Sequence, residues 1–257
     1  MYTLGIDIGS TTSKCAVIKD GKELVAHSLQ TGGLGTGGPE EAMAQLWQSC
    51  GLTRQDMACA FVTGYGRKNY KGADGEISEL TAHALGGRFV FPDLRTVIDI
   101  GGQDAKVIAL SPSGKMVNFV MNDKCAAGTG RFLDVMASIL RLDVDALDTE
   151  AAKATAPAAI SSTCTVFAES EVISQLANGV KRPDLVAGIC RSVASRVAAL
   201  ARRAGVTERV CLSGGVAQND AVRQALSDEL NVPVSVDPLA QYFGAIGAAL
   251  WAYKQQV

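Results

Sequence analysis

The chain has 257 residues, of which 47% are apolar and 19% are charged, a composition that excludes a disordered chain and suits one large or two small domains. Lys and Arg total 24 against 26 Asp and Glu, without a basic run, which argues against nucleic-acid binding. The longest mostly apolar stretch, Tyr242–Tyr253, is shorter than the roughly 20 residues of a membrane span. No basic residue precedes Asp7 and no long apolar run follows it, so we expect no signal peptide and a cytoplasmic protein.

A repeat with an offset of 92 residues organises the predicted elements. Ile6–Lys14 reappears as Ile98–Lys106, and an apolar run follows each copy. Each copy predicts a strand, a tight turn with an aspartate just before it, and a second strand. Asp20-Gly21 and Ser113-Gly114 then predict hairpin turns into a third strand. Two similar β-meanders in one chain indicate two similar lobes.

The rest of the chain has mainly helical periodicity. Helices are expected at Pro39–Cys50, Glu76–Leu85, Gly128–Leu140, Val166–Leu176, Asp184–Ala204, Ala217–Leu230 and Phe243–Tyr253, and short strands at Arg209–Leu212 and Val232–Val236. This pattern predicts an α/β protein with mixed sheets in two lobes.

The two Asp-x-Gly turns suit a nucleotide that is bound together with a metal ion. Glycine lets backbone N–H groups approach phosphate oxygens, and Lys14 could neutralise phosphate charge. Asp7 and Asp99 are candidates to hold Mg²⁺, through water. A single copy would be an ordinary turn with a solvated lysine, but two matched copies favour the nucleotide.

Two other glycine segments allow more than one interpretation. Gly33–Gly38 fits G-x-G-x-x-G, yet the strand before it ends a meander instead of opening a βαβ unit. A plain glycine loop is therefore favoured over a dinucleotide site. Ser213–Val216 either lets adenine and ribose lie against the backbone or is only a tight strand–helix turn. No Walker P-loop sequence is present.

The chain has seven cysteines and no C-x-x-C, which predicts neither a disulfide framework nor the usual zinc spacing. Cys125 and Cys164 each lie at about the first turn of a predicted helix, where the helix N-terminus stabilises a thiolate. The alternative is that both are small buried side chains, as expected for the other five. Two thiolates are too few for a [4Fe–4S] cluster, which takes four, and a symmetric dimer would supply the missing pair.

Six segments together identify a family resemblance: Gly5–Thr11, Thr63–Arg67, Asp99–Asp104, Asn122–Leu133, Ile160–Gln175 and Gly214–Asn219. Over essentially its whole length, the chain resembles the activators (component A) of 2-hydroxyacyl-CoA dehydratases, within the acetate kinase/sugar kinase/Hsp70/actin ATPase superfamily. The resemblance implies two ribonuclease-H-like lobes with a nucleotide cleft between them. We expect lobe I at residues 1–92 plus 243–257 and lobe II at residues 93–242.

The resemblance also implies a set of site residues. The first phosphate loop maps onto Ser10, Thr11, Thr12, Ser13 and Lys14, the second onto Gly102, Gln103 and Asp104, the adenosine contact onto Gly214 and Gly215, and a further nucleotide contact onto Gln241. Asp7, Asp99 and Asp104 would organise Mg²⁺ and the attacking water, without an assignment of the base. Cys125 and Cys164 of both subunits of a homodimer would bridge one [4Fe–4S] cluster. Thr12, where relatives often have alanine, is a departure that a loop binding through backbone N–H groups tolerates.

The activity that this resemblance implies is ATP-driven electron transfer. The cluster accepts one electron from a ferredoxin or flavodoxin, ATP hydrolysis shifts the lobes, and the electron passes to the dehydratase (component D). There it forms a ketyl radical from a 2-hydroxyacyl-CoA, which permits the loss of water.

Two other functions compete with this one. A small-molecule kinase of the same superfamily would need a substrate pocket, usually built from insertions, and the chain is short for that. An actin-like filament protein or an Hsp70-like binding module would need polymer contacts or a peptide-binding domain. A bound cluster separates the activator from both, since the fold alone hosts all three.

Overall fold

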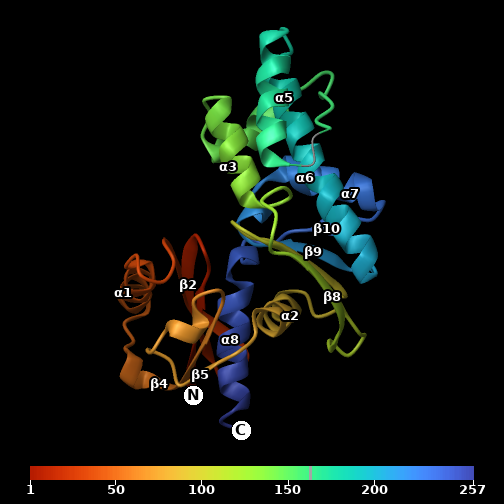
Figure 1. Ribbon diagram of the computed structural model, residues 1–257. Coiled ribbons are helices and arrows are strands. Elements are labelled where there is room, and N and C mark those ends of the chain that lie inside the picture. Colours follow the sequence, from red (N-terminus) through yellow and green to blue (C-terminus); the bar gives the residue numbers. More distant parts are fainter. Residues whose placement is uncertain (162–163) are drawn as a thin grey trace. The chain divides into compact units, whose positions relative to one another are not determined.

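The computed structural model describes residues 1–161 and 164–257 and divides into two compact units (Figure 1). Unit 1 comprises Met1–Leu94, Leu110–Met116 and Asp237–Val257, and unit 2 comprises Arg95–Ala109 and Val117–Val236. Each unit contains one five-stranded sheet. Ser162 and Thr163, which belong to the Ile160–Gln175 motif, lie outside the described residues.

The sheet of unit 1 has the strand order β3-β2-β1-β4-β5, and that of unit 2 has the order β8-β7-β6-β9-β10. The strands of unit 1 are β1 (Tyr2–Ile8), β2 (Thr12–Lys19), β3 (Glu23–Thr31), β4 (Met57–Thr63) and β5 (Gly75–Glu76). Those of the second sheet are β6 (Thr96–Ile100), β7 (Ala105–Leu110), β8 (Met116–Asn122), β9 (Val210–Ser213) and β10 (Val234–Ser235).

The two sheets share one topology. β1 pairs antiparallel with β2 and parallel with β4, and β6 pairs antiparallel with β7 and parallel with β9. The last two strands of each sheet are also parallel, β4 with β5 and β9 with β10. The predicted α/β class with two similar lobes is therefore confirmed, and the repeat in sequence is a repeat in topology.

Unit 1 contains three α-helices: α1 (Gly38–Cys50), α2 (Glu79–Val90) and α8 (Phe243–Lys254). α8 is apolar on nearly all sides because it packs on β1 and on α2 at the same time. Glycines make this approach possible: a Cβ on Gly5 would overlap with the Ala245 carbonyl oxygen, and one on Gly86 would overlap with that of Phe243. α2 begins at Glu79, later than predicted, because the Ser78 hydroxyl caps it by accepting from the Thr81 N–H at 3.2 Å.

Unit 2 contains α3 (Gly130–Ile139), α4 (Leu147–Ala151), α5 (Thr165–Ala177), α6 (Arg182–Ala204) and α7 (Asp220–Leu230). α6 buries the stripe Leu185, Ile189, Val193, Val197 and Ala201, whose spacing of four residues keeps one face of the helix toward the core. The 3-10 turns in the described part of the chain are Arg54–Asp56, Arg67–Asn69, Val144–Ala146, Gly215–Gln218 and Ala240–Tyr242. β4, β5 and α4 were not among the predicted elements.

Within residues 1–161 and 164–257, no helix combines the length and the apolar character needed to cross a membrane.

Candidate nucleotide and metal-cluster sites

Asp7 and Asp99 occupy the same position in two β-hairpins. The register of β1 and β2 places Asp7 opposite Lys14, and the register of β6 and β7 places Asp99 opposite Lys106. Both aspartates are 3% exposed. Each hairpin thus sets a buried carboxylate beside a lysine at the end of its first strand.

The turns that follow the two aspartates also correspond. The Gly9 N–H donates to the Thr12 carbonyl oxygen at 3.0 Å, and the Gly101 N–H donates to the Asp104 carbonyl oxygen at 2.9 Å. The same four-residue turn therefore closes both hairpins. Its side chains differ at the last position, where the first turn has a neutral hydroxyl and the second has a carboxylate.

The carboxylate of Asp7 is only partly satisfied. Its Oδ2 lies 3.7 Å from the Lys14 Nζ, whereas its buried Oδ1 accepts no hydrogen bond from any residue in the described part of the chain. A Cβ on Gly64, whose φ is +86°, would overlap with Oδ1, and a Cβ on Gly244 would lie 2.6 Å from Oδ2. An unpartnered buried carboxylate oxygen between two glycines suits Mg²⁺ or one of its water ligands.

The carboxylate of Asp99 has a different set of partners. The Lys106 Nζ lies 3.1 Å from Asp99 Oδ2 and 2.9 Å from Asp104 Oδ2, and the Ser213 hydroxyl donates to Asp99 Oδ1 at 2.8 Å. Lys106 is 2% exposed. One buried cation therefore compensates both predicted aspartates of the second loop. Asp7, in contrast, keeps a buried oxygen that accepts no hydrogen bond from the described residues.

The first predicted phosphate loop is accessible apart from one residue. Ser10, Thr12 and Lys14 are half-buried and Thr11 is exposed. Ser13 is fully buried, and its hydroxyl donates to the Gly32 carbonyl oxygen at 2.7 Å. The Ser13 side chain therefore holds neighbouring backbone, while the rest of the loop remains available to a ligand.

The G-x-G-x-x-G segment packs against the first turn. A Cβ on Gly33 would lie 2.6 Å from the Gly9 carbonyl oxygen, so only glycine permits this contact. Gly37, with φ of +82°, is the N-cap residue of α1. The plain glycine loop, the interpretation favoured by the sequence, explains these positions, because both glycines serve backbone geometry.

The glycines predicted to contact adenosine begin a turn beside the second loop. Gly214 has φ of +83°, and a Cβ there would overlap with the Ile100 carbonyl oxygen. Gly215 follows as an exposed residue, and Gly102 and Gln103 of the loop are half-buried and exposed. Gln241 lies in unit 1, half-buried in the 3-10 turn before α8.

The second loop is hydrogen-bonded to the start of α3. The Gly130 N–H donates to the Gly101 carbonyl oxygen at 2.9 Å, and the Arg131 N–H donates to the Gly102 carbonyl oxygen at 2.8 Å. The first N–H groups of a helix have no partner within the helix, and here the loop supplies the acceptors in place of a side-chain cap. The loop is thus joined by backbone contacts to the segment that follows Cys125.

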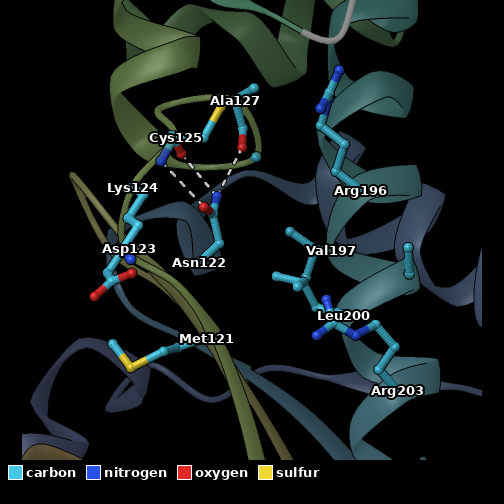
Figure 2. A pocket seen from close by; sticks show the side chains of 12 residues that line it. Met121, Asn122, Asp123, Lys124, Cys125, Ala127, Arg196, Val197, Leu200 and Arg203 are labelled. Atoms are coloured by element: carbon cyan, nitrogen blue, oxygen red, sulfur yellow. Dashed lines mark hydrogen bonds between the residues drawn. The ribbon is translucent and has the colours of Figure 1, made fainter.

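Cys125 lies in the loop before α3, so the prediction that it occupies the first turn of a helix is wrong. The reason is Asn122, whose side-chain amide donates to the carbonyl oxygens of Cys125 at 2.8 Å and Ala127 at 3.1 Å (Figure 2). The Cys125 N–H in turn donates to Asn122 Oδ1 at 3.2 Å. These bonds hold residues 123–129 as a separate loop, from which the exposed thiol is presented.

Cys164 is the N-cap residue of α5, which confirms its predicted position, and its thiol is exposed. The side chain of Glu171, which lies in the same helix, accepts from the Ser161 N–H at 3.1 Å and from the Ser161 hydroxyl at 3.0 Å. The Gln175 side chain donates to the Ala159 carbonyl oxygen at 2.8 Å. α5 therefore holds residues 159 and 161 by side-chain hydrogen bonds.

The other cysteines are poorer ligands. Burial raises the pKa of the Cys15 and Cys190 thiols to about 12, and burial also raises the pKa of Cys59 and Cys211. Cys50 is half-buried at the end of α1. Two exposed free thiols per chain, Cys125 and Cys164, fit one half of a four-thiolate cluster site.

Sequence reasoning missed three residues that shape these sites. Lys106 could have been found, because the repeat aligns it with Lys14. Ser213 was predicted only as part of the glycine turn Ser213–Val216, and Asn122 only as the first residue of the family segment Asn122–Leu133. Neither side chain was predicted to make a specific contact. Their contacts are made across strands or around a loop, and neither leaves a periodic signal in the sequence.

This fold and its two Asp-turn hairpins define the class of actin-, Hsp70- and sugar-kinase-like ATPases. A ROK-family glucokinase from Streptomyces griseus, solved with glucose and AMPPNP, has a TM-score of 0.58 at 16% identity, covering 99% of this chain and all of that one. At that identity the likeness shows the fold alone. The model of the BadF/BadG/BcrA/BcrD ATPase family matches residues 4–252, and the chain belongs to that family.

Two relatives match almost end to end. The (R)-2-hydroxyglutaryl-CoA dehydratase activating ATPase of Acidaminococcus fermentans is 57% identical over 99% of this chain and 98% of its own length, and the crystal structure of that component A has a TM-score of 0.96. The 2-hydroxyisocaproyl-CoA dehydratase activator of Clostridioides difficile is 51% identical over 99% of this chain and 96% of its own. Its structure with bound ADPNP also has a TM-score of 0.96, over 99% of this chain and 95% of that one. The resemblance to dehydratase activators is confirmed.

Proposed function

We propose that this ATPase activates a 2-hydroxyacyl-CoA dehydratase by delivering one electron to it. The observation that carries the proposal is the pair of exposed thiols, Cys125 and Cys164, in a chain 57% identical to an activating ATPase of such a dehydratase. The assembly is a cytoplasmic homodimer. Its subunits consist of lobe I, residues 1–92 plus 243–257, and lobe II, residues 93–242.

The nucleotide is held by backbone groups and a few side chains. Ser10, Thr11, Thr12 and Lys14 of the first loop and Gly102 and Gln103 of the second contact the phosphates, and Gly214, Gly215 and Gln241 contact the adenosine. Mg²⁺, when bound, neutralises phosphate charge and polarises the transferred group. Asp7 holds it through water, a role supported by its unpartnered Oδ1. Asp99 and Asp104, compensated by Lys106, position the attacking water.

The cysteines supply the ligands of the cluster. Two thiols per subunit require a two-fold axis to complete a set of four. A [4Fe–4S] cluster, when bound, accepts and releases one electron. Asn122 orders the loop that presents the Cys125 thiol, and Cys164 is the N-cap residue of α5. A ferredoxin or flavodoxin is the donor, and the dehydratase is the acceptor.

Coupling between nucleotide and thiols runs through backbone contacts. Gly101 and Gly102 accept from the first N–H groups of α3, and the Cys125 loop leads directly into that helix. A shift of the second loop on ATP binding or hydrolysis therefore moves the start of α3 and the loop with it. This linkage supplies the mechanical step that an ATP-driven electron transfer requires.

The test is the iron and acid-labile sulfide content of anaerobically purified protein. We expect about four of each per dimer, and their loss in Cys125→Ala and in Cys164→Ala. Cys50→Ala is the matched control, since that thiol donates to the Leu46 carbonyl oxygen within α1, and should retain the iron. Absence of iron after anaerobic reconstitution would overturn the proposal. Transfer of phosphate from ATP to a small hydroxylated or carboxylated acceptor would then identify a kinase.

A further inference from the structure

An open groove lies beside Cys125 in unit 2. It has a volume of about 400 Å³ and runs between the end of β8 with its following loop and one side of α6. Figure 2 shows Asn122, Lys124 and Cys125 on one wall and Arg196, Leu200 and Arg203 on the other. The groove is therefore continuous with the thiol that is proposed to hold the cluster.

The charge of this groove is opposite to that of the chain. The whole chain carries a formal net charge of −2. The charged residues that line the groove are three cations, Lys124, Arg196 and Arg203, and one acid, Asp123. A local excess of positive charge on an acidic protein attracts a partner with an acidic surface and raises its rate of encounter.

An apolar stripe leads into the groove along the edge of the sheet. β8 is the outermost strand, and Val117, Phe119 and Met121 project from the same face of it because they alternate along the strand. They are 65%, 45% and 38% exposed, and Met121 also lines the groove. Apolar centres with a charged rim are typical of protein interfaces.

We propose that this groove and the adjoining face of β8 are the docking site of the electron donor, a small protein with an acidic surface. The inference rests on the proposed function, because the donor is useful only if Cys125 holds a redox centre. The step moves one electron: the reduced carrier loses it, the cluster gains it, and no bond is formed or broken. A short-lived encounter needs only a small interface, and charge attraction supplies its rate.

The probe is a reduced two-cluster bacterial ferredoxin, mixed anaerobically with the oxidised, cluster-containing protein in a stopped-flow instrument. Charge reversal in the double variant Arg196→Glu, Arg203→Glu should lower the second-order rate constant of cluster reduction at low salt by about tenfold or more. Added salt should slow the reduction of the native protein, because it screens the attraction, and should speed that of the variant, because the reversed charges repel the acidic donor. The matched control is Arg191→Glu, an exposed arginine of α6 outside the groove, which should retain the native rate.

A second measurement is independent of turnover. The dissociation constant of fluorescently labelled, oxidised ferredoxin should rise in the double variant and not in the control. Reduction by photoreduced 5-deazaflavin, a small neutral reductant, should be unchanged if the groove acts by docking. Equal loss with both reductants, or loss of the dimer in sedimentation, would overturn the proposal.

Two outcomes separate this inference from the proposed function. A double variant with full iron content and an unchanged rate with ferredoxin would overturn the docking site and leave the activator intact. A variant reduced normally but unable to activate the dehydratase would also overturn it, by assigning the groove to the acceptor. Native protein without iron would instead overturn the proposed function itself.

Discussion

The two Asp-turn hairpins have the same register and the same turn, yet their charges are balanced in different ways. In the first, Lys14 lies 3.7 Å from Asp7, and one oxygen of Asp7 accepts no hydrogen bond from the described residues. In the second, Lys106 is buried between Asp99 and Asp104. A repeated motif thus yields one hairpin open to a cation and one closed by an internal ion network.

The last residue of the turn explains this difference. Position 12 is threonine in the first copy, and the equivalent position 104 is aspartate in the second. The added carboxylate gives the second lysine two partners and favours its burial, since a buried charge is tolerated only when it is compensated. The comparison teaches that topological symmetry can persist while the charges of the two copies are balanced differently: one keeps a carboxylate oxygen available to a cation, and the other holds its two carboxylates in place with a buried lysine.

The largest expected effect is on stability. Lys106→Met leaves Asp99 and Asp104 without their shared cation, so the free energy of unfolding should fall by about 3–5 kcal/mol. Lys14→Met removes a longer, partly solvated ion pair and should cost about 1 kcal/mol. Urea unfolding of both variants measures the difference. Equal losses in the two hairpins would contradict the asymmetry.

The next effect is on catalysis. Asp7→Asn removes the carboxylate that is available to Mg²⁺, so ATP hydrolysis should slow by about 100-fold, or about 2.7 kcal/mol of barrier, without a loss of stability. Asp99→Asn should slow hydrolysis and also lower stability, because it removes one of the two carboxylates that compensate Lys106. Phosphate release as a function of Mg²⁺ concentration, with urea unfolding alongside, separates the two. An Asp7→Asn variant with native turnover would refute the assignment.

A third variant introduces into the first turn the carboxylate that distinguishes the second. Thr12→Asp should draw Lys14 toward the new carboxylate and repel phosphate, which weakens ADPNP binding by about tenfold, or about 1.4 kcal/mol. Thr12→Asn adds a similar shape without charge and should bind nearly as the native protein does. A fluorescence titration with labelled ADPNP measures both. Equal weakening by the two variants would show that shape, and not charge, sets the affinity.

The smallest expected effect is on the pH dependence of stability. It concerns the second strand of each hairpin, where the repeat aligns Cys15 with Val107. Burial raises the pKa of Cys15 to about 12, the Asp7 carboxylate adds to this and a hydrogen bond with Ser28 opposes it. An unfolded thiol has a pKa of about 8.5, so the stabilising preference for the neutral thiol is complete below that pH and is lost as pH rises toward 12.

Cys15→Val should abolish this pH dependence. The free energy of unfolding of the native protein, relative to the variant, should fall by about 1 kcal/mol between pH 7 and pH 9. Urea unfolding at the two pH values gives the difference, and Cys15→Ala, which also lacks a thiol, should behave like the valine variant in its pH dependence. Parallel curves for native and variant proteins would mean that the thiol does not ionise on unfolding in this range.

Much of the fold could be predicted because periodicity and repetition are local properties. The 92-residue repeat indicated two meanders, and the long amphipathic stripe of α6 indicated its helix. Boundaries were less predictable, since they depend on single capping contacts. α2 begins at Glu79 because of Ser78, and α3 begins at Gly130 because Asn122 holds the preceding loop.

The sequence by itself determined the class of the protein, the matched aspartates of the two turns and the two cysteines that stand apart from the others. These features depend on residue type and spacing, which a linear sequence contains. The tertiary structure alone decided which aspartate keeps an unpartnered oxygen, that Lys106 is buried between two carboxylates, and that the second loop is joined to α3. The charge balance and the accessible cationic groove depend on distances between residues far apart in the chain, and packing sets those distances.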